Sequence, residues 1–274
     1  MKEDISKRFA HFKEFLPKIQ AFLIETQNKD SFEIEKKGPI DLVTEADKGS
    51  EKMVVEEILK HFPDDHILGE EGSSVRGRNQ YRWIIDPVDG TTNFAHRLPL
   101  YGICLGLENI ESGLIEMGIV SFPALSDTYH AIRGNGAFKN GKRIQVSKTN
   151  ELINALISTG FPYDKKARIE SVMQNLKSIL LSVRDVRRTG VASLDLCWVA
   201  EGRFDGYWEE NLKPWDMAAA SIILEEAGGK ITTYDGNNFS IFIPNLLATN
   251  SIIHKQMLEK LSIISPQILS EFRI

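Results

Sequence analysis

A run of apolar residues that ends directly in two aspartates constrains this chain more than any other feature. The stretch WIIDPVDGTTNF extends from Trp83 to Phe94, and RWIID is typical of a buried strand. Proline, aspartate and glycine then favour a turn, which brings Asp86 and Asp89 to the end of that strand. Two carboxylates at this spacing repel each other. The sequence therefore predicts a strand whose end carries acidic side chains, neutralised by positive charge from elsewhere.

The composition argues against several classes of protein. The chain has 274 residues, of which 42% are hydrophobic and 26% charged, as in a soluble globular protein with one large domain or two small ones. A net charge of −5 with no basic block argues against nucleic-acid binding. No apolar run approaches the ~20 residues that a membrane span needs, and the charged N-terminus has no signal core, so we expect no membrane partner. Cys104 and Cys197 lie within apolar stretches, which favours buried free thiols and a cytoplasmic protein.

Helical and strand patterns are mixed along the whole chain. Apolar residues recur at helical spacing from Ile5 to Leu23, and Pro17 should kink or interrupt that helix. YGICLGLE and LIEMGIVSF predict strands, followed by a Gly-rich turn region, RGNGAFKNGKRI. In the second half, RIESVMQNLKSILLSV and DMAAASIILEEAGG predict helices, and KITTY and LLATN predict strands. We divide the chain into an α+β half, 1–145, and an α/β half, 146–274, which share one core in a single compact unit.

Four acidic segments lie where predicted elements begin or end. They are DLVTEAD, GEEG, DPVDGTT and PWD, which contribute Asp47, Glu70, Asp86, Asp89 and Asp216. Each alone has a purely structural interpretation. Asp47 can close a capping box with Thr44, Asp216 can cap a helix, and the others can lie in turns. Together they indicate a different role, because several carboxylates converge on one point only where cations neutralise them.

The cation predicted at this point is Mg²⁺. Asp86, Asp89 and the carbonyl of Val88 are hard oxygen ligands, which Mg²⁺ prefers, whereas the histidines are scattered and show no zinc spacing. Gly90 lets a backbone N–H approach an anion closely, Thr91 adds a hydroxyl, and the helix that follows points its N-terminus at the same place. Two metal ions ~3.5–4 Å apart can activate a water and stabilise a leaving oxygen. The pattern indicates metal-dependent chemistry on a phosphate group.

A covalent mechanism is the main competitor. Phosphatases that form an aspartyl-phosphate carry an Asp-x-Asp-x-Thr signature after a strand, and DPVDGTT is superficially similar. In DPVDGTT the position two residues after Asp86, where the signature needs an aspartate, holds Val88. The second aspartate, Asp89, stands three residues after Asp86. That signature also lies near the N-terminus in most such chains. We therefore rank the covalent mechanism well below the two-metal one.

The ordered set of motifs resembles the inositol monophosphatase family of metal-dependent, lithium-sensitive phosphatases. DPVDGTTNF and PWDMAAA are similar to its two signatures. DLVTEAD, GEEG, GNGAFKNGKRIQVS, RRTGVASLDLCWVAEGRFDGYWE and EEAGGKIT match in order and spacing, from Lys36 to Asn250. The second signature usually ends in glycine where Ala220 stands, an exchange expected to have small consequences unless the backbone packs very closely there. The resemblance implies an α/β fold, an alternating α/β/α/β/α sandwich of the sugar-phosphatase type, in a homodimer.

The resemblance also implies the ligands of two or three Mg²⁺ ions per active site. Glu70, Asp86 and the carbonyl of Val88 would hold the first ion. Asp86, Asp89 and Asp216 would hold the second. A third, weaker ion would lie near Glu70. Most of these ligands fall in the half 1–145, and Asp216 falls in the half 146–274.

Catalytic roles follow from the same resemblance. A water would be the nucleophile, oriented by Thr91, with Asp47 behind it and Glu70 nearby. The attack would be in line, without a covalent intermediate. The backbone N–H groups of Gly90 and Thr91 would hold the phosphate, and Lys36 would order the third metal site.

The substrate implied by the resemblance is a small polyol phosphate, myo-inositol 1-phosphate. Glu209 matches the family's sugar-hydroxyl acceptor, and a buried carboxylate accepts two vicinal hydroxyls well. Its neighbour Glu210 leaves that assignment open, as Glu71 does for Glu70. The residues expected to contact the substrate are Asp89, Gly90, Thr91, Ala192, Ser193, Glu209 and Asp216. The alternatives are a broad sugar phosphatase acting on fructose 1,6-bisphosphate, an enzyme for histidinol phosphate, 3′-phosphoadenosine 5′-phosphate or NADP, and a non-catalytic binding or regulatory module on the same fold.

Overall fold

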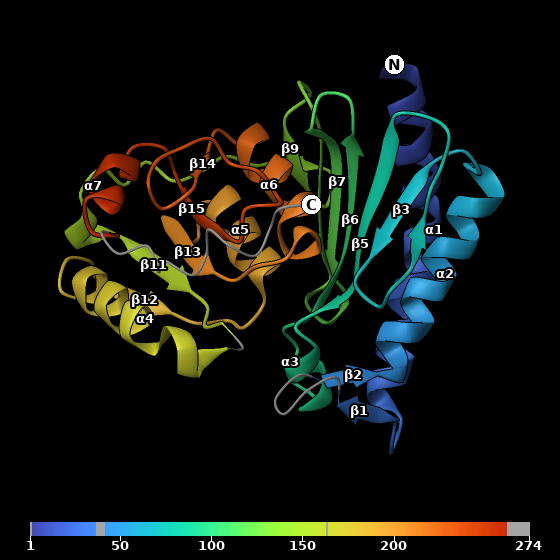
Figure 1. The fold of residues 1–274 in the computed structure, drawn as a ribbon, viewed down its shortest axis with the longest axis horizontal. Helices are drawn as coiled ribbons and strands as arrows, with labels where there is room; N and C mark the ends of the chain where they lie inside the picture. The colour runs from blue at the N-terminus through green and yellow to red at the C-terminus, as the bar shows by residue number, and fades with distance from the viewer. Residues whose placement is uncertain (1, 37–41, 163, 262–274) are drawn as a thin grey trace.

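The chain folds into five layers in the order α/β/α/β/α, as Figure 1 shows for this computed structural model. The structure describes residues 2–36, 42–162 and 164–261. Two helices cover one face of an eight-stranded sheet, and two more separate it from a five-stranded sheet. The layered α/β sandwich predicted from the sequence is confirmed. The division at 145/146 stays a prediction, although the larger sheet ends at Arg143 and the smaller one begins at Leu156.

The eight-stranded sheet has the order β10-β9-β8-β7-β6-β5-β3-β4. Neighbouring strands are antiparallel except β3 and β5, which are parallel. Every residue of β6 is buried, because helices cover both faces of the sheet. The strands are β3 (His66–Gly69), β4 (Ser74–Val75), β5 (Tyr81–Asp89), β6 (Gly102–Asn109), β7 (Leu114–Phe122), β8 (Asp127–Ile132), β9 (Ala137–Lys139) and β10 (Lys142–Arg143).

The segment predicted as a Gly-rich turn region contains a small hairpin. Strands β9 and β10 pair through it, with Lys142 opposite Lys139. Asn140 and Gly141 join them, with φ angles of 48° and 77°. Asn-Gly with positive φ at both positions is the preferred two-residue hairpin turn. The prediction of turns was right, but it missed the strands between them.

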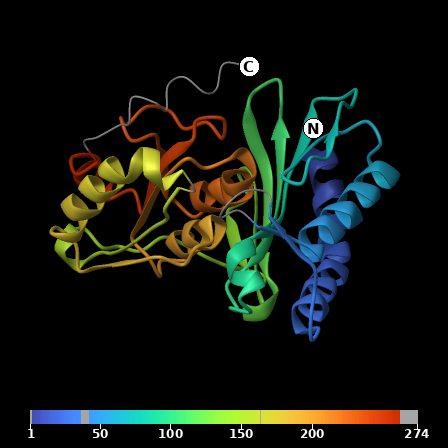
Figure 2. The same cartoon turned by 60° about the horizontal axis from the view of Figure 1, so that its bottom comes forward.

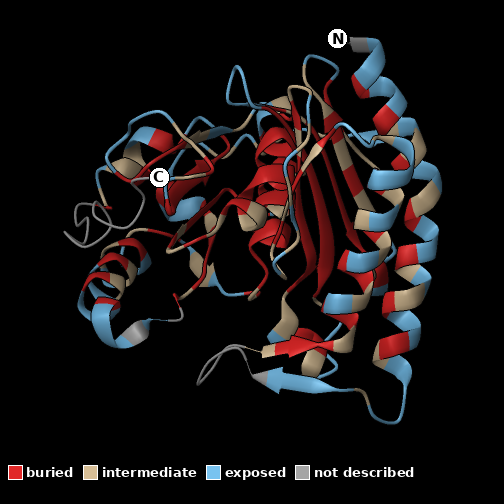
Figure 3. Cartoon of the chain, turned by 45° about the vertical axis from the view of Figure 1, so that its right-hand side comes forward, coloured by how far each residue is buried: buried red, intermediate tan, exposed pale blue. Residues whose placement is uncertain are grey.

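Helices α1 (Lys2–Asn28) and α2 (Glu45–His61) form the outer layer beside the larger sheet, as Figure 2 shows from below. Pro17 lies inside α1 without interrupting it, so the predicted interruption is wrong. The face on either side of Pro17 is buried, including Phe12, Leu16 and Ile19 (Figure 3). Packing of these side chains stabilises the helix against the hydrogen bond that proline removes. Among the described helices, none is long and apolar enough to cross a membrane.

A two-stranded sheet precedes α2. It pairs β1 (Ile34–Lys36) with β2 (Leu42–Thr44) in antiparallel register.

The middle layer consists of α5 (Ala192–Ala200) and α6 (Pro214–Glu226), which pack against each other. Helix α6 lies very close to the larger sheet, because a Cβ added at Gly118 would be 2.1 Å from the carbonyl oxygen of Ala219. Glycine in β7 and alanine in α6 therefore make this approach possible. Ala220, where the family signature usually has glycine, is buried in the same hydrophobic core.

The five-stranded sheet has the order β12-β11-β13-β15-β14. Helices α4 (Lys165–Leu180) and α7 (His254–Leu258) cover its outer face, where Ile179 and Met257 join one hydrophobic cluster with Trp208 and Leu247. The strands are β11 (Leu156–Thr159), β12 (Asp185–Arg187), β13 (Gly206–Glu210), β14 (Lys230–Thr232) and β15 (Asn245–Thr249).

Candidate active site

A cavity of about 650 Å³ lies where the end of β5 meets β13 and the beginnings of α5 and α6. Strand β5 continues as far as Asp89, further than the predicted RWIID. Its register against β6 shifts between Asp86, opposite Cys104, and Asp89, opposite Gly102. This bulge places one extra residue in β5 and turns both aspartates toward the cavity that they line. The predicted turn is thus a distortion within the strand.

Gly90 makes the connection from β5 to the short helix α3 (Thr91–Ala95). Its φ of 93° lies in the left-handed region, and an added Cβ would be 2.7 Å from Cγ2 of Val191. Glycine is therefore required both by the backbone conformation and by the close approach. The first N–H groups of a helix have no acceptor within the helix, and those of α3 begin beside Gly90 and Thr91, which line the cavity.

Asp47 connects α2 to this site. One of its oxygens accepts hydrogen bonds from the N–H of Thr44, at 2.8 Å, and from the hydroxyl of the same residue, at 2.5 Å. The structural interpretation of Asp47 as a capping residue is therefore correct. Its other oxygen accepts the hydroxyl of Thr91 at 2.9 Å, and that hydroxyl also lies 3.0 Å from the carbonyl oxygen of Val88. Asp47 thus caps α2 and holds a cavity residue at the same time.

Glu70 lies in the cavity wall, and Glu71 does not. The backbone N–H of Glu71 donates to the carboxylate of Glu51 at 2.9 Å, and that of Ser73 donates to it at 3.1 Å. Gly69 makes room for this carboxylate, because a Cβ there would lie 2.5 Å from it. Glu51 is buried in α2, one turn after Asp47. The sequence analysis missed Glu51, although its i+4 spacing from Asp47 puts both on one helix face.

The beginnings of two longer helices hold the remaining carboxylates. The backbone N–H of Ser193, in the first turn of α5, donates to Asp89 at 2.7 Å. The N–H of Lys213 donates to Asp216 at 2.7 Å, in the first turn of α6. The predicted role of Asp216 as a helix cap is therefore correct in part, since it lies three residues inside the cap. Both contacts place negative charge near the positive end of a helix dipole.

The charges in this cavity raise one another's pKa values. Burial raises the pKa of Asp86 well above its ordinary value, and the neighbouring carboxylates raise it further. The same two causes act in that order on the pKa of Asp216. Burial raises the pKa of Asp89 to about 6, although hydrogen bonds from Ser193 lower it. A divalent cation among these carboxylates would favour their ionised forms, and Mg²⁺ prefers oxygen ligands. The residues present therefore fit Mg²⁺.

The opposite side of the cavity carries Glu209. Its carboxylate accepts a hydrogen bond from the Tyr207 hydroxyl, and burial raises its pKa to about 7. Gly160 is needed here, because an added Cβ would lie 1.9 Å from this carboxylate. Glu210 instead accepts from the hydroxyl of Ser171 at 3.1 Å and lies outside the cavity wall. The alternation of side chains along β13 thus separates the two glutamates.

The remaining predicted residues are distributed as follows. Ala192 lines the cavity, and Ser193 is buried behind it with its N–H on Asp89. The side chain of Lys36 lies outside the described residues. Arg188 also lines the cavity, which the sequence analysis did not predict, and it is the positive charge that most lowers the pKa of Glu209.

The similarity to known proteins extends over almost the whole chain. Residues 12–266 match the sequence model of the inositol monophosphatase family. The chain belongs to the inositol monophosphatase family. This confirms the family predicted from the motifs and makes the chain a phosphatase of that family.

Relatives in this family have different names. The chloroplastic phosphatase IMPL1 of Arabidopsis thaliana is 42% identical over 233 residues, which are 82% of this chain but only 62% of the plant protein. The inositol-1-monophosphatase of Rhizobium meliloti is 39% identical over 86% of this chain and 87% of its own. The Nus factor SuhB of Haemophilus influenzae is 36% identical over 86% of this chain and 88% of its own.

Solved structures of family members have the same fold. The extragenic suppressor protein suhB of Bartonella henselae has a TM-score of 0.85 and 36% identity, covering 89% of this chain and 94% of its own. An IMPase/NADP phosphatase complexed with Mg²⁺ and phosphate has a TM-score of 0.80 and 26% identity, covering 96% and 97%. An inhibitory complex of staphylococcal inositol monophosphatase-1, soaked in LiCl, has a TM-score of 0.81 and 26% identity, covering 96% of both chains.

Proposed function

We propose that this phosphatase hydrolyses the phosphate monoester of a small polyol, myo-inositol 1-phosphate, with Mg²⁺. The observation that carries the proposal is the composition of one cavity, which contains both a cluster of carboxylates and the half-buried glutamate Glu209. The cluster suits cations and a phosphate, and Glu209 suits vicinal hydroxyl groups. A polyol phosphate presents both chemical groups in one molecule.

The first Mg²⁺ would be held by Glu70, Asp86 and the carbonyl of Val88, and the second by Asp86, Asp89 and Asp216, with a third near Glu70. When bound, these ions would lower the pKa of a water molecule and stabilise the leaving oxygen. The raised pKa values of Asp86 and Asp216 support this assignment, because burial and then mutual repulsion disfavour their charged forms unless cations neutralise them. Inhibition by Li⁺ belongs to the same proposal.

The protein's own groups would orient the reactants. The Thr91 hydroxyl donates a hydrogen bond to Asp47, so its oxygen can accept a hydrogen bond from the attacking water. Glu70 would lie near that water. The N–H groups of Gly90 and Thr91 would hold the phosphate, which the position of both residues in the cavity wall and the left-handed turn at Gly90 support. No side chain would become covalently attached.

The polyol would contact Glu209, with Ala192 and Ser193 on the same side. Because Tyr207 fixes the carboxylate of Glu209, two neighbouring hydroxyls could donate to its oxygens at little cost in side-chain entropy. The other family substrates remain alternatives within this proposal: fructose 1,6-bisphosphate, histidinol phosphate, 3′-phosphoadenosine 5′-phosphate and NADP.

The test is phosphate release with saturating Mg²⁺ from a panel of inositol 1-phosphate and those four alternatives. We expect the highest kcat/KM with inositol 1-phosphate. Comparable values for several sugars would reduce the function to a broad sugar phosphatase. A clear preference for another substrate would contradict the assignment of the polyol.

A binding or regulatory role is the second candidate, because several relatives are named Nus factors or putative Nus factors. Such a module would gain thermal stability from Mg²⁺ without releasing phosphate from any ester. We also propose a homodimer, and a cytoplasmic location that the buried free thiols of Cys104 and Cys197 support.

A further inference from the structure

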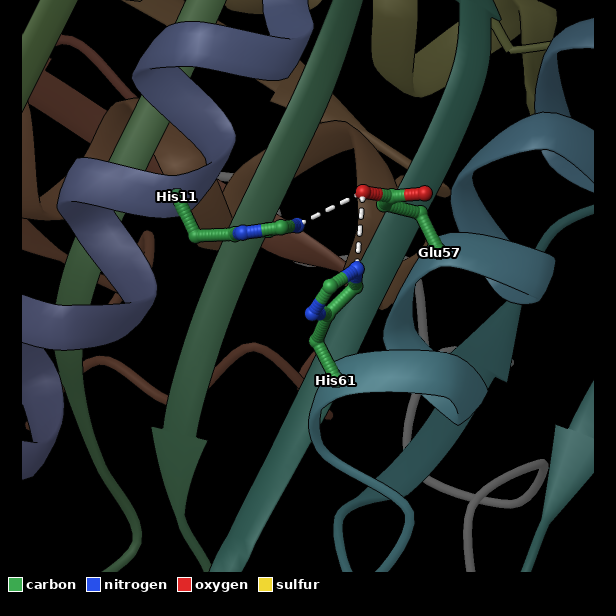
Figure 4. Close-up of side chains that lie close together, drawn as sticks. All are labelled: His11, Glu57 and His61. Carbon is green, nitrogen blue, oxygen red and sulfur yellow. Dashed lines mark hydrogen bonds and ion pairs between the residues drawn. The ribbon is translucent and has the colours of Figure 1, made fainter.

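Two histidines and a glutamate from two different helices meet at the outer layer, away from the cavity. Figure 4 shows His11 of α1 pointing toward Glu57 and His61 of α2. Nε2 of His11 lies 2.8 Å from Oε1 of Glu57, and Nε2 of His61 lies 3.4 Å from the same oxygen. One ligand atom from each residue lies within 4.8 Å of the other two.

The helices themselves bring these groups together. Glu57 and His61 are four residues apart, which places them on one face of α2. Helix α1 packs against that face and contributes His11, whose ring centroid is 4.2 Å from that of His61. The rings of Phe12 and Phe62 each lie edge-on to His11, at 5.6 Å, and restrict its orientation. The donors are therefore held in place by packing as well as by their own contacts.

We propose that His11, Glu57 and His61 bind a divalent transition-metal ion, of the class of Zn²⁺, which joins α1 to α2. Imidazole nitrogen suits Zn²⁺, Cu²⁺ or Ni²⁺, whereas Mg²⁺ prefers oxygen. Zn²⁺ binds nitrogen and carboxylate oxygen at about 2.0–2.2 Å. Tetrahedral ligands at that distance are about 3.4 Å apart, which is close to the two distances to Glu57, 2.8 and 3.4 Å. All three ligand atoms lie within 4.8 Å of one another, so side-chain rotation would complete the approach. Two imidazoles and one carboxylate leave the fourth position to water.

The electrostatic surroundings permit a cation. Arg8 lies one turn before His11, but its guanidinium is paired with Asp65 at 2.5 and 2.7 Å, so its charge is offset. The site is also separate from the proposed catalytic residues, since Glu57 lies ten residues along α2 from Asp47, about 15 Å. His11, Glu57 and His61 are partly exposed, so an ion can enter from solvent.

The sequence analysis expected scattered histidines without zinc spacing, whereas the fold brings His11 and His61 together at Glu57. The pair Glu57 and His61 is visible in the sequence at helical spacing, but His11 comes from a helix that is remote in sequence. An ion pair alone would also explain the 2.8 Å contact between His11 and Glu57. The two interpretations differ in one measurable respect, which is stabilisation by added metal.

The experiment uses the full chain without a histidine tag, stripped by a chelator and then supplied with saturating Mg²⁺ to occupy the carboxylate cavity. Zn²⁺ is added, and its binding is followed by calorimetry and its effect by the melting temperature. We expect one more equivalent of Zn²⁺ in the wild-type protein than in the double variant His11→Gln/His61→Gln. Zn²⁺ at about 100 times its dissociation constant should raise the wild-type melting temperature by about 5 °C, and that of the double variant by less.

Matched variants separate this site from nonspecific binding. Glu57→Gln should weaken the additional Zn²⁺ equivalent, whereas Glu56→Gln, which removes a neighbouring exposed carboxylate of α2, should not. His96→Gln, at the exposed end of α3, should also bind as the wild type does. Phosphatase activity with Mg²⁺ alone should stay unchanged in the double variant, which shows that it is folded. Identical Zn²⁺ isotherms and melting shifts in the wild type and the double variant would overturn the proposal.

Discussion

The hydroxyl of Thr91 donates a hydrogen bond to the carboxylate of Asp47 across 2.9 Å, although the two residues are 44 positions apart. The contact connects the first turn of α2 to the residue that follows the bulge in β5. It fixes the direction of the hydroxyl proton, and thereby the direction of its lone pairs. A water molecule in the cavity can therefore donate to Thr91 in a defined orientation.

Replacing Thr91 by valine should abolish this orientation without changing the size of the side chain. We expect kcat to fall about 100-fold, with KM little changed, because a misplaced nucleophile costs about this much. Thr91→Ser keeps the hydroxyl and should retain most of the activity. Steady-state phosphate release by the three proteins provides the comparison. Equal rates for wild type and Thr91→Val would exclude Thr91 from water orientation.

Glu51 should control the affinity for Mg²⁺ although it does not line the cavity. Its carboxylate accepts N–H groups of Glu71 and Ser73 and so fixes the turn that carries Glu70. In Glu51→Gln, one of these donors would face an amide group. We expect the Mg²⁺ concentration for half-maximal activity to rise about 10-fold, as is typical when a group that holds a ligand is altered. Glu56→Gln on the exposed side of α2 is the control, and an equal Mg²⁺ requirement in both variants would refute this role.

Glu209 should determine the preference for a polyol. Glu209→Gln should lower kcat/KM for inositol 1-phosphate about 10- to 100-fold, because the hydroxyls lose a charged acceptor. Phenyl phosphate has no such hydroxyls, and its hydrolysis should change little. Glu210→Gln removes the adjacent carboxylate, which contacts Ser171 instead, and should leave the ratio of the two substrates unchanged. If both variants shift the ratio of kcat/KM for the two substrates equally, Glu209 does not determine the preference for a polyol.

The end of β5 could be predicted from the sequence because the residues that identify it are neighbours in the chain. An apolar run and a group of turn formers identify the strand, the aspartates and Gly90 without reference to the rest of the chain. The choice between Glu70 and Glu71 could not be made in this way, since it depends on Glu51 in another element. The choice between Glu209 and Glu210 required the orientation of β13 in its sheet.

The predictions from the sequence that were wrong or missing also concern contacts between distant residues. Pro17 breaks an isolated helix, but the buried face of α1 outweighs that local effect. The role of Gly160 becomes visible only when β11 and β13 lie side by side. The histidine cluster of α1 and α2 depends on the packing of two helices. Most of what the sequence could not specify is contact between elements that are remote along the chain.

His254 should make the protein less stable in mild acid. Its two ring nitrogens lie 2.9 Å from the hydroxyls of Thr232 and Thr249, and burial lowers its pKa from 6.5 to about 4. Below pH 6.5 the unfolded chain binds a proton at this ring that the folded protein does not bind. The free energy of unfolding should therefore decrease as the pH falls from 6.5 to about 4, by at most about 3 kcal/mol from this group.

Urea unfolding across that pH range measures the effect. The variant His254→Gln has no titrating ring, so its free energy of unfolding should depend less steeply on pH, whatever its absolute stability. Equal slopes for the two proteins would show that His254 does not contribute to the acid sensitivity.

The most direct test of the account is phosphate release from inositol 1-phosphate as a function of Mg²⁺, with wild type and Asp89→Asn measured side by side. The amide oxygen can still accept the N–H of Ser193, and removing the Asp89 charge relieves its repulsion of Asp86 and Asp216, so the variant should fold and melt at least as high without metal. We predict Mg²⁺-dependent release by the wild type and a loss of at least about 100-fold in the variant. Release by the wild type without Mg²⁺, or an unchanged rate in Asp89→Asn, would contradict the proposed metal-dependent mechanism.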